Sequence, residues 1–398
     1  MKFSATVFRV LSRVLFDYRD AVGPANFPPN WKKTVFTKVD GIGDFVLATT
    51  FLNCFAKAQP SAEVTVVCRA PTAELARWQY PQWDIEVVPA KVRPFREIIA
   101  SVPVRRRMSA LPEFDTLVDL RGYRDAADAA ISTWIPAKQK FAITNGLSSE
   151  FRWAALPNEE RAFDCLISRP ERSDEICEDI ACHRALVREL LGVDSSLLLP
   201  NLRVKHDEIA SLREKTRISH ESPLLVVCPG TSIPQKEYPP AALAHAIIQS
   251  RLPSDVRIVL AGGKNDARTI LPLLSEIRKF RPVTDLSGQL TIAENAILLA
   301  TADFVIAMDS CHAHIAGAVG TPALVLLSGR QRGFFGPWNP SPTFRWLFSS
   351  DPQTEESRPF IYDKGLSSES LPVSVVSDEI SSLMKIALSP VHRLRPSG

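Results

Sequence analysis

The sequence has no cysteine arrangement of the kind that holds a zinc ribbon, a redox centre or a disulfide framework. Its seven cysteines are an odd, dispersed set without a CxxC pair, and the closest two, Cys177 and Cys182, match neither a zinc ribbon nor a redox motif. We therefore expect reduced, buried thiols in a cytosolic protein.

Long apolar runs and a strong charge excess are absent as well. No stretch of about 18 uninterrupted apolar residues exists, so no transmembrane helix is predicted. The net charge is only +3, which permits phosphorylated ligands and gives no indication of a nucleic-acid partner. The length of 398 residues and the 45% hydrophobic content indicate a globular protein of two domains.

The first 20 residues carry an amphipathic basic pattern. Apolar residues recur at helical spacing from Phe3 to Leu15, while Arg9, Arg13 and Arg19 fill the other side. Arginines inside the apolar stretch argue against a secretory signal peptide. The pattern fits a helix on an anionic membrane face, and it equally describes a helix docked on the protein's own core.

From Lys33 onward, strand patterns alternate with helix patterns. In the first half we predict strands at 34–39, 63–68, 85–88, 113–119 and 139–143, and helices at 44–58, 71–78 and 124–134. Such alternation is typical of a parallel, doubly wound α/β sheet. The periodicity is lost at about residues 150–175, which we interpret as a linker or insertion.

A second series of the same kind follows. Helices at 177–191 and 207–216 precede strands at 224–228, 256–261, 283–286, 304–307 and 323–327, with helices at 241–250, 266–280, 292–300 and 373–388. We therefore predict two Rossmann-like domains with an interdomain cleft, at 33–175 and 176–398, after an amphipathic extension at 1–32.

Polar turns that follow strands are the candidate sites, because ligands of α/β sheets bind at the carboxyl ends of the strands. In the turn Lys38–Asp44, Gly41 and Gly43 permit a tight bend and a close backbone approach. Asp44 falls in the first turn of the next helix, where it either caps the helix or faces a ligand; its spacing alone favours the cap. The turn lacks a full GxGxxG, which disfavours a Rossmann dehydrogenase.

The corresponding turn of the second half carries hydroxyl groups and a lysine. Gly230-Thr231-Ser232 follows the strand at 224–228 and offers N–H and O–H donors. Lys236 is close enough in sequence to reach the same ligand as a point charge. A solvent-facing lysine before the next helix is an equally open interpretation.

A further turn, Asp309–His314, lies between an apolar strand and a helix of small residues. Free N–H groups and the helix dipole favour an anion there, so we predict a phosphate site with Ser310 as a donor. Asp309 either anchors the loop or accepts hydrogen bonds from ligand hydroxyls. His314 adds positive charge when it is protonated. A metal is not expected, because His312 and His314 are two residues apart and do not share a helix face. No GxSxG elbow supports a serine hydrolase.

These motifs resemble the heptosyltransferase family of bacterial lipopolysaccharide synthesis, glycosyltransferase family nine. The similarity runs from about Lys33 to Leu388 and is strongest from Pro223 to Gly329. The matching segments are Gly41–Asp44, like the family's Gly-Asp turn; Phe114–Arg121, like its Phe-Asp-x-x-(Ile/Val)-Asp-Leu segment; Lys236–Pro239, like its Lys-x-Trp-Pro phosphate site; and Asp285–Gly288, Asp309–His314 and Gly320–Pro322, like its most diagnostic stretch.

The resemblance implies a GT-B arrangement with the nucleotide-sugar on the C-terminal domain. It implies an inverting transfer of a sugar, from an ADP-heptose-like donor to a glycolipid or saccharide hydroxyl, without a metal or other cofactor. The roles it implies are Asp44 as catalytic base; Thr231, Ser232, Lys236 and Ser310 at the donor diphosphate; Gly230, Asp309, Cys311 and His314 around the donor; and Gly41, Gly43 and Arg121 on the acceptor side. The enzyme would act at the cytoplasmic face of the inner membrane, with residues 1–20 as the contact.

Some positions depart from the family pattern. Tyr238 replaces the tryptophan, and Cys311 stands where the family has glycine, so either the helix start tolerates a Cβ or the phosphate pocket is altered. Arg330 and Arg332 add positive charge where the family has Phe-Gly-x-Thr. Two other functions stay open: a GT-B transferase that uses a UDP- or GDP-sugar, and a non-catalytic nucleotide-sugar-binding or scaffold protein.

Overall fold

The computed structural model describes residues 28–88, 98–124, 126–144, 162–171, 176–219, 221–327, 335–348 and 371–389. The amphipathic pattern at 1–20 and the two arginines Arg330 and Arg332 lie outside these residues. None of the helices within them has the length and apolar character needed to span a membrane. The described residues divide into two compact units. The first consists of the described part of Met1–Arg172 together with Glu178–Leu198. The second consists of the described residues from Leu199 onward, together with Ile176 and Cys177.

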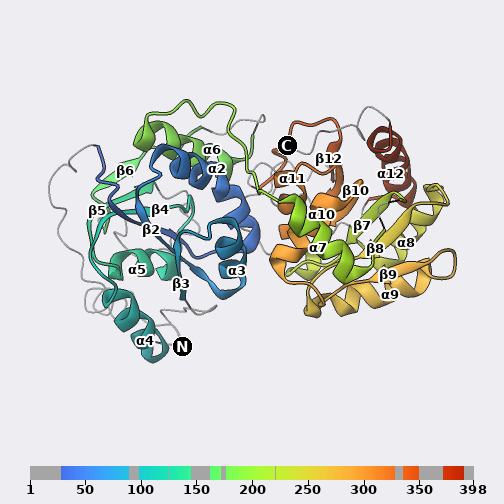
Figure 1. The fold of residues 1–398 in the computed structure, drawn as a ribbon, viewed down its shortest axis with the longest axis horizontal. Coiled ribbons are helices and arrows are strands. Elements are labelled where there is room, and N and C mark those ends of the chain that lie inside the picture. Colours follow the sequence, from blue (N-terminus) through green and yellow to red (C-terminus); the bar gives the residue numbers. More distant parts are fainter. Residues whose placement is uncertain are drawn as a thin grey trace, which may run out of the picture. The chain divides into compact units, whose positions relative to one another are not determined.

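The first unit is built on a six-stranded parallel sheet in the order β3-β2-β1-β4-β5-β6 (Figure 1). Its strands are β1 (Lys33–Lys38), β2 (Glu63–Arg69), β3 (Asp84–Val88), β4 (Phe114–Asp119), β5 (Ala137–Ile143) and β6 (Cys165–Ile167). The central strands β1 and β4 are almost wholly buried, as expected for a sheet that is covered on both faces.

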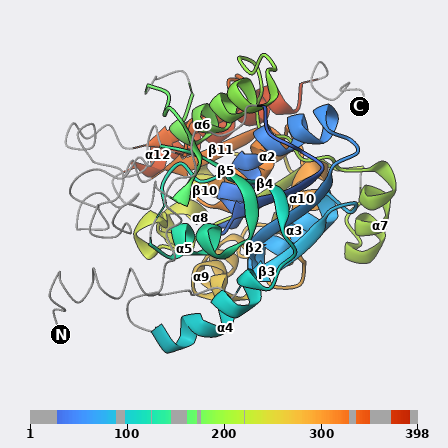
Figure 2. The same ribbon diagram turned by 90° about the vertical axis from the view of Figure 1, so that its left-hand side faces the viewer.

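Helices cover this sheet in two groups. They are α2 (Ile42–Ala58), α3 (Ala70–Gln79), α4 (Ile98–Ser109), α5 (Ala126–Trp134) and α6 (Glu178–Leu186), which continues into a π-helical turn, η2 (Val187–Leu191). Helix α2 packs against α3 and α6, whereas α4 packs against α5 (Figure 2). Helices α2 and α3 lie in the connections that run from β1 through β2 to β3, whereas α5 lies in the connection from β4 to β5, in the opposite direction along the sheet.

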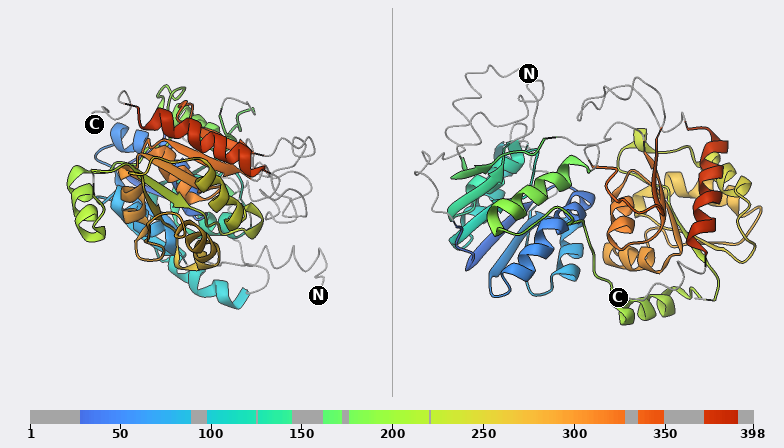
Figure 3. Two further views of the ribbon diagram at one scale, coloured as in Figure 1. Left: turned by 90° about the vertical axis from the view of Figure 1, so that its right-hand side faces the viewer. Right: turned by 90° about the horizontal axis from the view of Figure 1, so that it is seen from above.

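The second unit repeats the design with the strand order β12-β11-β10-β7-β8-β9. The strands are β7 (Leu224–Cys228), β8 (Arg257–Leu260), β9 (Val283–Asp285), β10 (Phe304–Met308), β11 (Ala323–Leu327) and β12 (Phe344–Phe348). The helices are α7 (His206–Thr216), α8 (Pro240–Gln249), α9 (Ala267–Ile277), α10 (Ile292–Thr301), α11 (Cys311–Ala318) and α12 (Val373–Ala387), with the 3₁₀ turns η3 (Pro234–Lys236) and η4 (Lys264–Asp266). Helix α12, drawn in red in Figure 3, packs beside α8, and α10 packs between α7 and α11.

Each sheet has one pair of neighbouring strands at which the winding direction reverses. In the first unit these are β1 and β4, where Thr37 pairs with Asp119. In the second they are β7 and β10, where Cys228 pairs with Ala307. The loops that leave the carboxyl ends of such a pair are where doubly wound proteins bind ligands. The fold therefore places the turns after β1, β4, β7 and β10 at the two candidate sites.

The predicted class, α/β with two parallel sheets, is confirmed. The division between the units differs from the sequence-based boundary at 175/176, because α6 packs against α2 of the first unit. Glu178 at the start of α6 accepts hydrogen bonds from Arg169 Nε at 2.6 Å and from the Tyr123 hydroxyl at 2.7 Å, which ties the helix to the loops after β6 and β4. Helix α4 and strands β6 and β12 are present without having been predicted.

The aromatic core beneath α2 offers a test of the first unit. Phe36 is fully buried, and its ring lies 4.8 Å from that of Phe55 and 5.5 Å from that of Phe51, between centroids. Phe36→Ala should lower the free energy of unfolding by about 3–5 kcal/mol in urea denaturation, because it leaves a cavity. Phe280→Ala, at a side chain that is 65% exposed, should change it by less than about 0.5 kcal/mol. Equal effects of the two changes would contradict the packing described.

Candidate functional site

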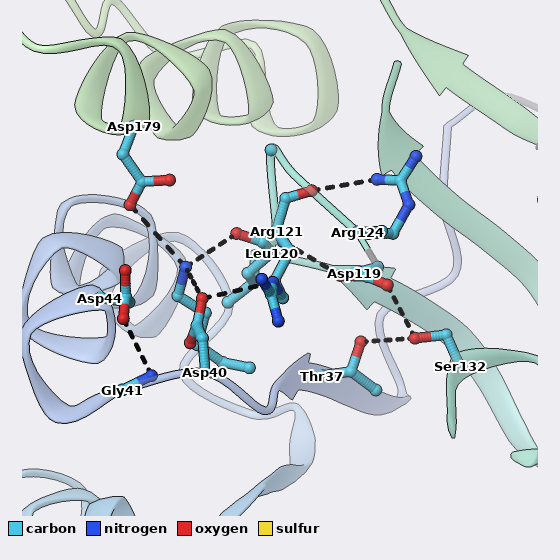
Figure 4. Close-up of polar contacts among 12 residues, drawn as sticks. Thr37, Asp40, Gly41, Asp44, Asp119, Leu120, Arg121, Arg124, Ser132 and Asp179 are labelled. Carbon is cyan, nitrogen blue, oxygen red and sulfur yellow. Dashed lines mark hydrogen bonds and ion pairs between the residues drawn. The ribbon is translucent and has the colours of Figure 1, made fainter. Parts of the chain in front are cut away.

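The turn between β1 and α2 brings Asp44 back onto the backbone of Gly41. Gly41 is the residue before the first turn of α2, Gly43 lies within that turn, and Asp44 Oδ2 accepts a hydrogen bond from the Gly41 N–H at 2.9 Å (Figure 4). A Cβ on Gly41 would lie 2.8 Å from that oxygen, so glycine permits this close approach. The capping geometry that the spacing favours is therefore present, and it holds the carboxylate of Asp44 in one place.

The surroundings of Asp44 favour its protonated form. Burial raises the pKa of Asp44, and the negative charges of Asp40 and Asp179 add to the effect. Lys38 and Arg121 act in the opposite direction and only partly offset it, so the pKa lies at about 7. A carboxylate of this kind accepts a proton near neutral pH far more readily than an ordinary aspartate does.

Lys38, the last residue of β1, is a buried cation with three oxygen neighbours. Only 1% of its side chain is exposed, and its Nζ lies 2.9 Å from Asp40 Oδ2 and 3.8 Å from Asp179 Oδ2. The ammonium also donates to the carbonyl of Leu120, which follows β4, at 3.3 Å. Burial alone would lower the pKa of Lys38, but Asp179 and Asp40 outweigh that effect and raise it. The lysine therefore stays charged.

Helix α6 contributes Asp179 and His183 to this cluster. His183 is fully buried, and its Nε2–H donates to the Leu120 carbonyl at 3.1 Å, while Nδ1 lies 3.9 Å from Asp179 Oδ2. Burial lowers the pKa of His183 to about 4, so the imidazole is neutral at pH 7. It positions the loop after β4 and adds no charge there.

Arg121 enters the site from the loop after β4. Its Nε lies 3.5 Å from Asp40 Oδ2, and its backbone N–H donates to Asp119 Oδ1 at 3.0 Å. Arg124 is fully buried and donates to the carbonyl of Arg121 at 3.0 Å. Ser132 donates to the second oxygen of Asp119 at 2.8 Å, which anchors the end of β4 (Figure 4). Arg121 thus faces the turn that holds Asp40 and Asp44.

In the second unit, Lys236 and Asp309 meet at the equivalent pair of strands. Lys236 ends η3 in the loop after β7, and its Nζ lies 2.9 Å from Asp309 Oδ2 in the loop after β10; both side chains are buried. The solvent-facing interpretation of Lys236 is therefore wrong. Ser310 precedes α11, and its Oγ is buried with no hydrogen-bond partner among the described residues. A buried cation, a hydroxyl group and the N–H groups of a helix start are suited to an anionic ligand.

The turn after β7 lies close to Asp266. A Cβ on Gly230 would collide with the carboxylate of Asp266, whose Oδ2 accepts the N–H of Gly263 at 2.7 Å. Thr231 is buried, and its Oγ1 accepts the N–H of Ile233 at 3.3 Å, whereas Ser232 is exposed. Of the predicted hydroxyl donors, Thr231 and Ser310 thus have buried hydroxyl groups, and Ser232 does not.

His314 has a different environment from the one expected. It is buried, and its Nδ1 accepts a hydrogen bond from Trp338 Nε1–H at 3.1 Å. This bond requires an unprotonated Nδ1, so the imidazole is neutral here and does not supply the positive charge considered above. Trp338 also packs on Gly317, where a Cβ would lie 2.7 Å from its ring. The sequence pattern gave no indication of this tryptophan.

Cys311 is accommodated at the start of α11 in ordinary helical geometry. Among the described residues, the non-glycine residues with positive φ are Arg217 and Arg251, so Cys311 carries no such strain. Its Sγ lies 3.8 Å from His312 Nδ1. Within the described ranges, no group of three or more His, Cys, Asp or Glu side chains is arranged to hold a metal ion.

The predicted residues thus form two sets, one at each pair of reversing strands. Gly41, Gly43, Asp44 and Arg121 belong to the first unit; Gly230, Thr231, Ser232, Lys236, Asp309, Ser310, Cys311 and His314 belong to the second. Sequence reasoning missed Asp179 and His183, although their spacing of four on a helix places them on one face. Two doubly wound α/β units, each with a polar site at its switch point, are typical of the GT-B class of fold.

Comparisons with known proteins agree with this class. The model of glycosyltransferase family 9 (heptosyltransferase) matches residues 123–364, and the chain belongs to this family. The glycosyltransferase family 9 protein of Veillonella parvula has the same fold, with a TM-score of 0.68 at 17% identity over 90% of this chain and 98% of that one. The E. coli ADP-heptose lipopolysaccharide heptosyltransferase II gives a TM-score of 0.62 at 17% identity, over 90% of this chain and 100% of the other.

Sequence similarity to curated proteins is confined to part of the chain. Lipopolysaccharide heptosyltransferase 2 of Salmonella typhimurium is 27% identical over 164 residues, which are 40% of this chain and 46% of that protein. The aligned segment thus spans less than half of the relative's length. A solved E. coli heptosyltransferase with ADP-2-deoxy-2-fluoro heptose gives a TM-score of 0.61 at 16% identity, over 88% of this chain and 99% of that one.

The raised pKa of Asp44 has a consequence for stability. The folded state holds this proton up to about pH 7, whereas an unfolded aspartate releases it near pH 3.9, so ionised Asp44 destabilises the fold. Asp44→Asn, which keeps an oxygen for the Gly41 N–H, should raise the melting temperature. The gain in melting temperature should grow from about pH 4 to pH 7 and stay constant at higher pH. Thermal melts from about pH 4 to above pH 7 measure this.

Asp40→Asn should have the opposite sign and serves as the control. Burial raises the pKa of Asp40, but Lys38 and Arg121 outweigh burial and lower it. Its ionised form therefore stabilises the fold above about pH 4, and the substitution should lower the melting temperature at pH 7. Destabilisation of similar size by both changes would contradict the assigned electrostatics.

Proposed function

We propose that the protein is an inverting glycosyltransferase that moves a sugar, heptose, from an ADP-heptose-like donor to a hydroxyl of a lipopolysaccharide-type or other saccharide acceptor. Membership of glycosyltransferase family 9 supports the reaction class. The relatives include a lipopolysaccharide heptosyltransferase, which supports the acceptor. A structural neighbour was solved with ADP-2-deoxy-2-fluoro heptose, which supports the donor.

The observation that carries the proposal is the state of Asp44. It lies at the carboxyl end of β1, where doubly wound sheets bind ligands, and its carboxylate is held by the Gly41 N–H at 2.9 Å. Its pKa of about 7 matches the range in which a general base works best at neutral pH. The dipole at a helix N-terminus stabilises an ionised carboxylate, so capping alone does not account for the raised pKa of Asp44.

The chemistry is a single displacement at the anomeric carbon. As the acceptor oxygen attacks this carbon, its proton passes to the carboxylate of Asp44. The bond between the anomeric carbon and the diphosphate oxygen breaks on the opposite side, so the configuration inverts and the nucleoside diphosphate leaves. Arg121, which faces the same turn, is suited to an acidic or hydroxyl group of the acceptor.

The second unit would stabilise the charge on the departing diphosphate. Lys236, anchored by Asp309, supplies a fixed positive charge, while Ser310 Oγ and the first N–H groups of α11 supply hydrogen bonds. Thr231 and Ser232 would add donors from the turn after β7. Because these groups are largely positioned before the donor binds, little reorganisation is needed during the reaction.

Removal of the base tests the proposal. Asp44→Asn should reduce the rate of heptosyl transfer from ADP-heptose by at least about 100-fold, with nucleotide binding unchanged, because the substitution removes only the proton acceptor. Transfer is measured as the release of ADP in the presence of bacterial glycolipid extracts. Asp115→Asn, at an aspartate on β4 that pairs with Lys138 at 2.7 Å, should leave the rate within a factor of about 2. Full turnover by Asp44→Asn would disprove its role.

Competition between nucleotides tests the donor site separately. ADP should raise the melting temperature of the wild type more than UDP or GDP does, and Lys236→Met should remove most of this shift, because the variant lacks the charge that faces the diphosphate. Lys279→Met, at an exposed lysine that pairs with Glu276, should retain it. A larger shift with UDP or GDP would reassign the donor, and an unchanged ADP shift in Lys236→Met would exclude Lys236 from the site.

A further inference from the structure

Asp40 lies four residues before the proposed base and is held between two cations. Its Oδ2 is 2.9 Å from Lys38 Nζ and 3.5 Å from Arg121 Nε, and 12% of its side chain is exposed. These cations keep the pKa of Asp40 low in spite of its burial. Asp40 is therefore a fixed negative charge in the turn that carries Asp44.

The positive and negative charges that act on Asp44 are equal in number before Asp44 itself is counted. Lys38 and Arg121 are the cations that act on it, and Asp40 and Asp179 are the matching anions. His183, which faces Asp179 from the same helix, is neutral. Among the described residues, no basic side chain forms an ion pair with Asp44, whose hydrogen bond is to the Gly41 N–H. Asp44 is thus a further carboxylate beside a cluster whose positive charges are already paired.

We infer that Asp40 is a positioning residue whose fixed negative charge, held beside the buried Asp44, increases the proton affinity of Asp44 during sugar transfer. The inference rests on the proposed function, in which Asp44 accepts the proton of the acceptor hydroxyl. Asp179 supports the arrangement from α6, because it shares Lys38 with Asp40 and thereby prevents the lysine from acting on Asp44 alone.

The two aspartates of this turn therefore have different roles: Asp40 stays ionised, and Asp44 accepts the proton. Two carboxylates close together cannot both ionise easily, and the one with cationic partners ionises first. Asp40 has these partners and ionises first, so its negative charge adds to the burial that raises the pKa of Asp44. Asp44 therefore accepts a proton near neutral pH. Asp40 acts through Asp44 and does not need to touch the substrate.

The pH dependence of kcat/KM tests this. In the wild type, the acidic limb should lie near pH 7, because kcat/KM reports the pKa of the base in the free enzyme. Asp40→Asn removes the neighbouring negative charge and leaves Lys38 less compensated, and both changes favour ionised Asp44. The limb should therefore move to lower pH by about one unit or more. Asp40→Glu, which keeps the charge, should keep the limb near its wild-type position.

A direct titration separates this inference from the proposed function. In protein labelled with ¹³C at the aspartate carboxyl carbons, the signal of Asp44 is identified by its loss in Asp44→Asn. Its midpoint should fall by about one pH unit in Asp40→Asn and stay unchanged in Asp115→Asn, the matched control. The Asp115 side chain is 11% exposed and is likewise paired with a lysine, but it lies on β4 near the amino end of the strand.

The outcomes are distinct. A shifted carboxyl titration supports the inference even if no sugar is transferred, in which case the proposed function alone fails. A folded Asp40→Asn variant with an unchanged titration and an unchanged limb overturns the inference, and an equal loss of rate at every pH would show a purely structural role. If Asp40→Asn does not fold, Asp179→Asn should move the titration in the same direction by a smaller amount, and no movement there overturns the inference as well.

Discussion

The buried ammonium of Lys38 is the constraint on which the first unit's site depends. A charge removed from water in this way is stable only when oxygen atoms of opposite charge or partial charge surround it. Its partners come from three separate segments: Asp40 in the following turn, Leu120 after β4, and Asp179 on α6. The turn that carries Asp44 is thereby tied to the neighbouring strand and to a helix that follows β6 in the sequence.

The second unit also has a buried lysine paired with an aspartate, but its site has a different chemical character. Lys236 and Asp309 join the loops after β7 and β10, as Lys38 and Leu120 join those of β1 and β4. In the first unit the carboxylates outnumber the cations around the turn, which leaves Asp44 as a base. In the second, an anchored cation, the hydroxyl of Ser310 and a helix start are suited to an anion. One topology therefore supports two chemically different sites.

Much of the fold was predictable where buried strands produce uninterrupted apolar runs. The strands Leu224–Cys228 and Ala323–Leu327 have the predicted bounds. Strand β12, Phe344–Phe348, was missed because it contains an arginine and most of its residues are only partly buried. Helix α6 was recognised within a longer helix but assigned to the second domain, because the chain before it has no periodicity and its packing on α2 leaves no local signal.

The sequence by itself determined the order of most strands, turns and helices, and with it the residues that follow the central strands, among them Asp44, Lys236 and Ser310. This works because strand and helix periods are local properties of the chain. Only the tertiary structure decided the chemical state of these residues. The proton affinity of Asp44 depends on its burial and on charges from distant parts of the sequence, such as Asp179 and Arg121. Lys236 meets Asp309 because the loops that carry them follow two neighbouring strands. Electrostatic interactions fall off with distance in space, and no sequence pattern records that distance.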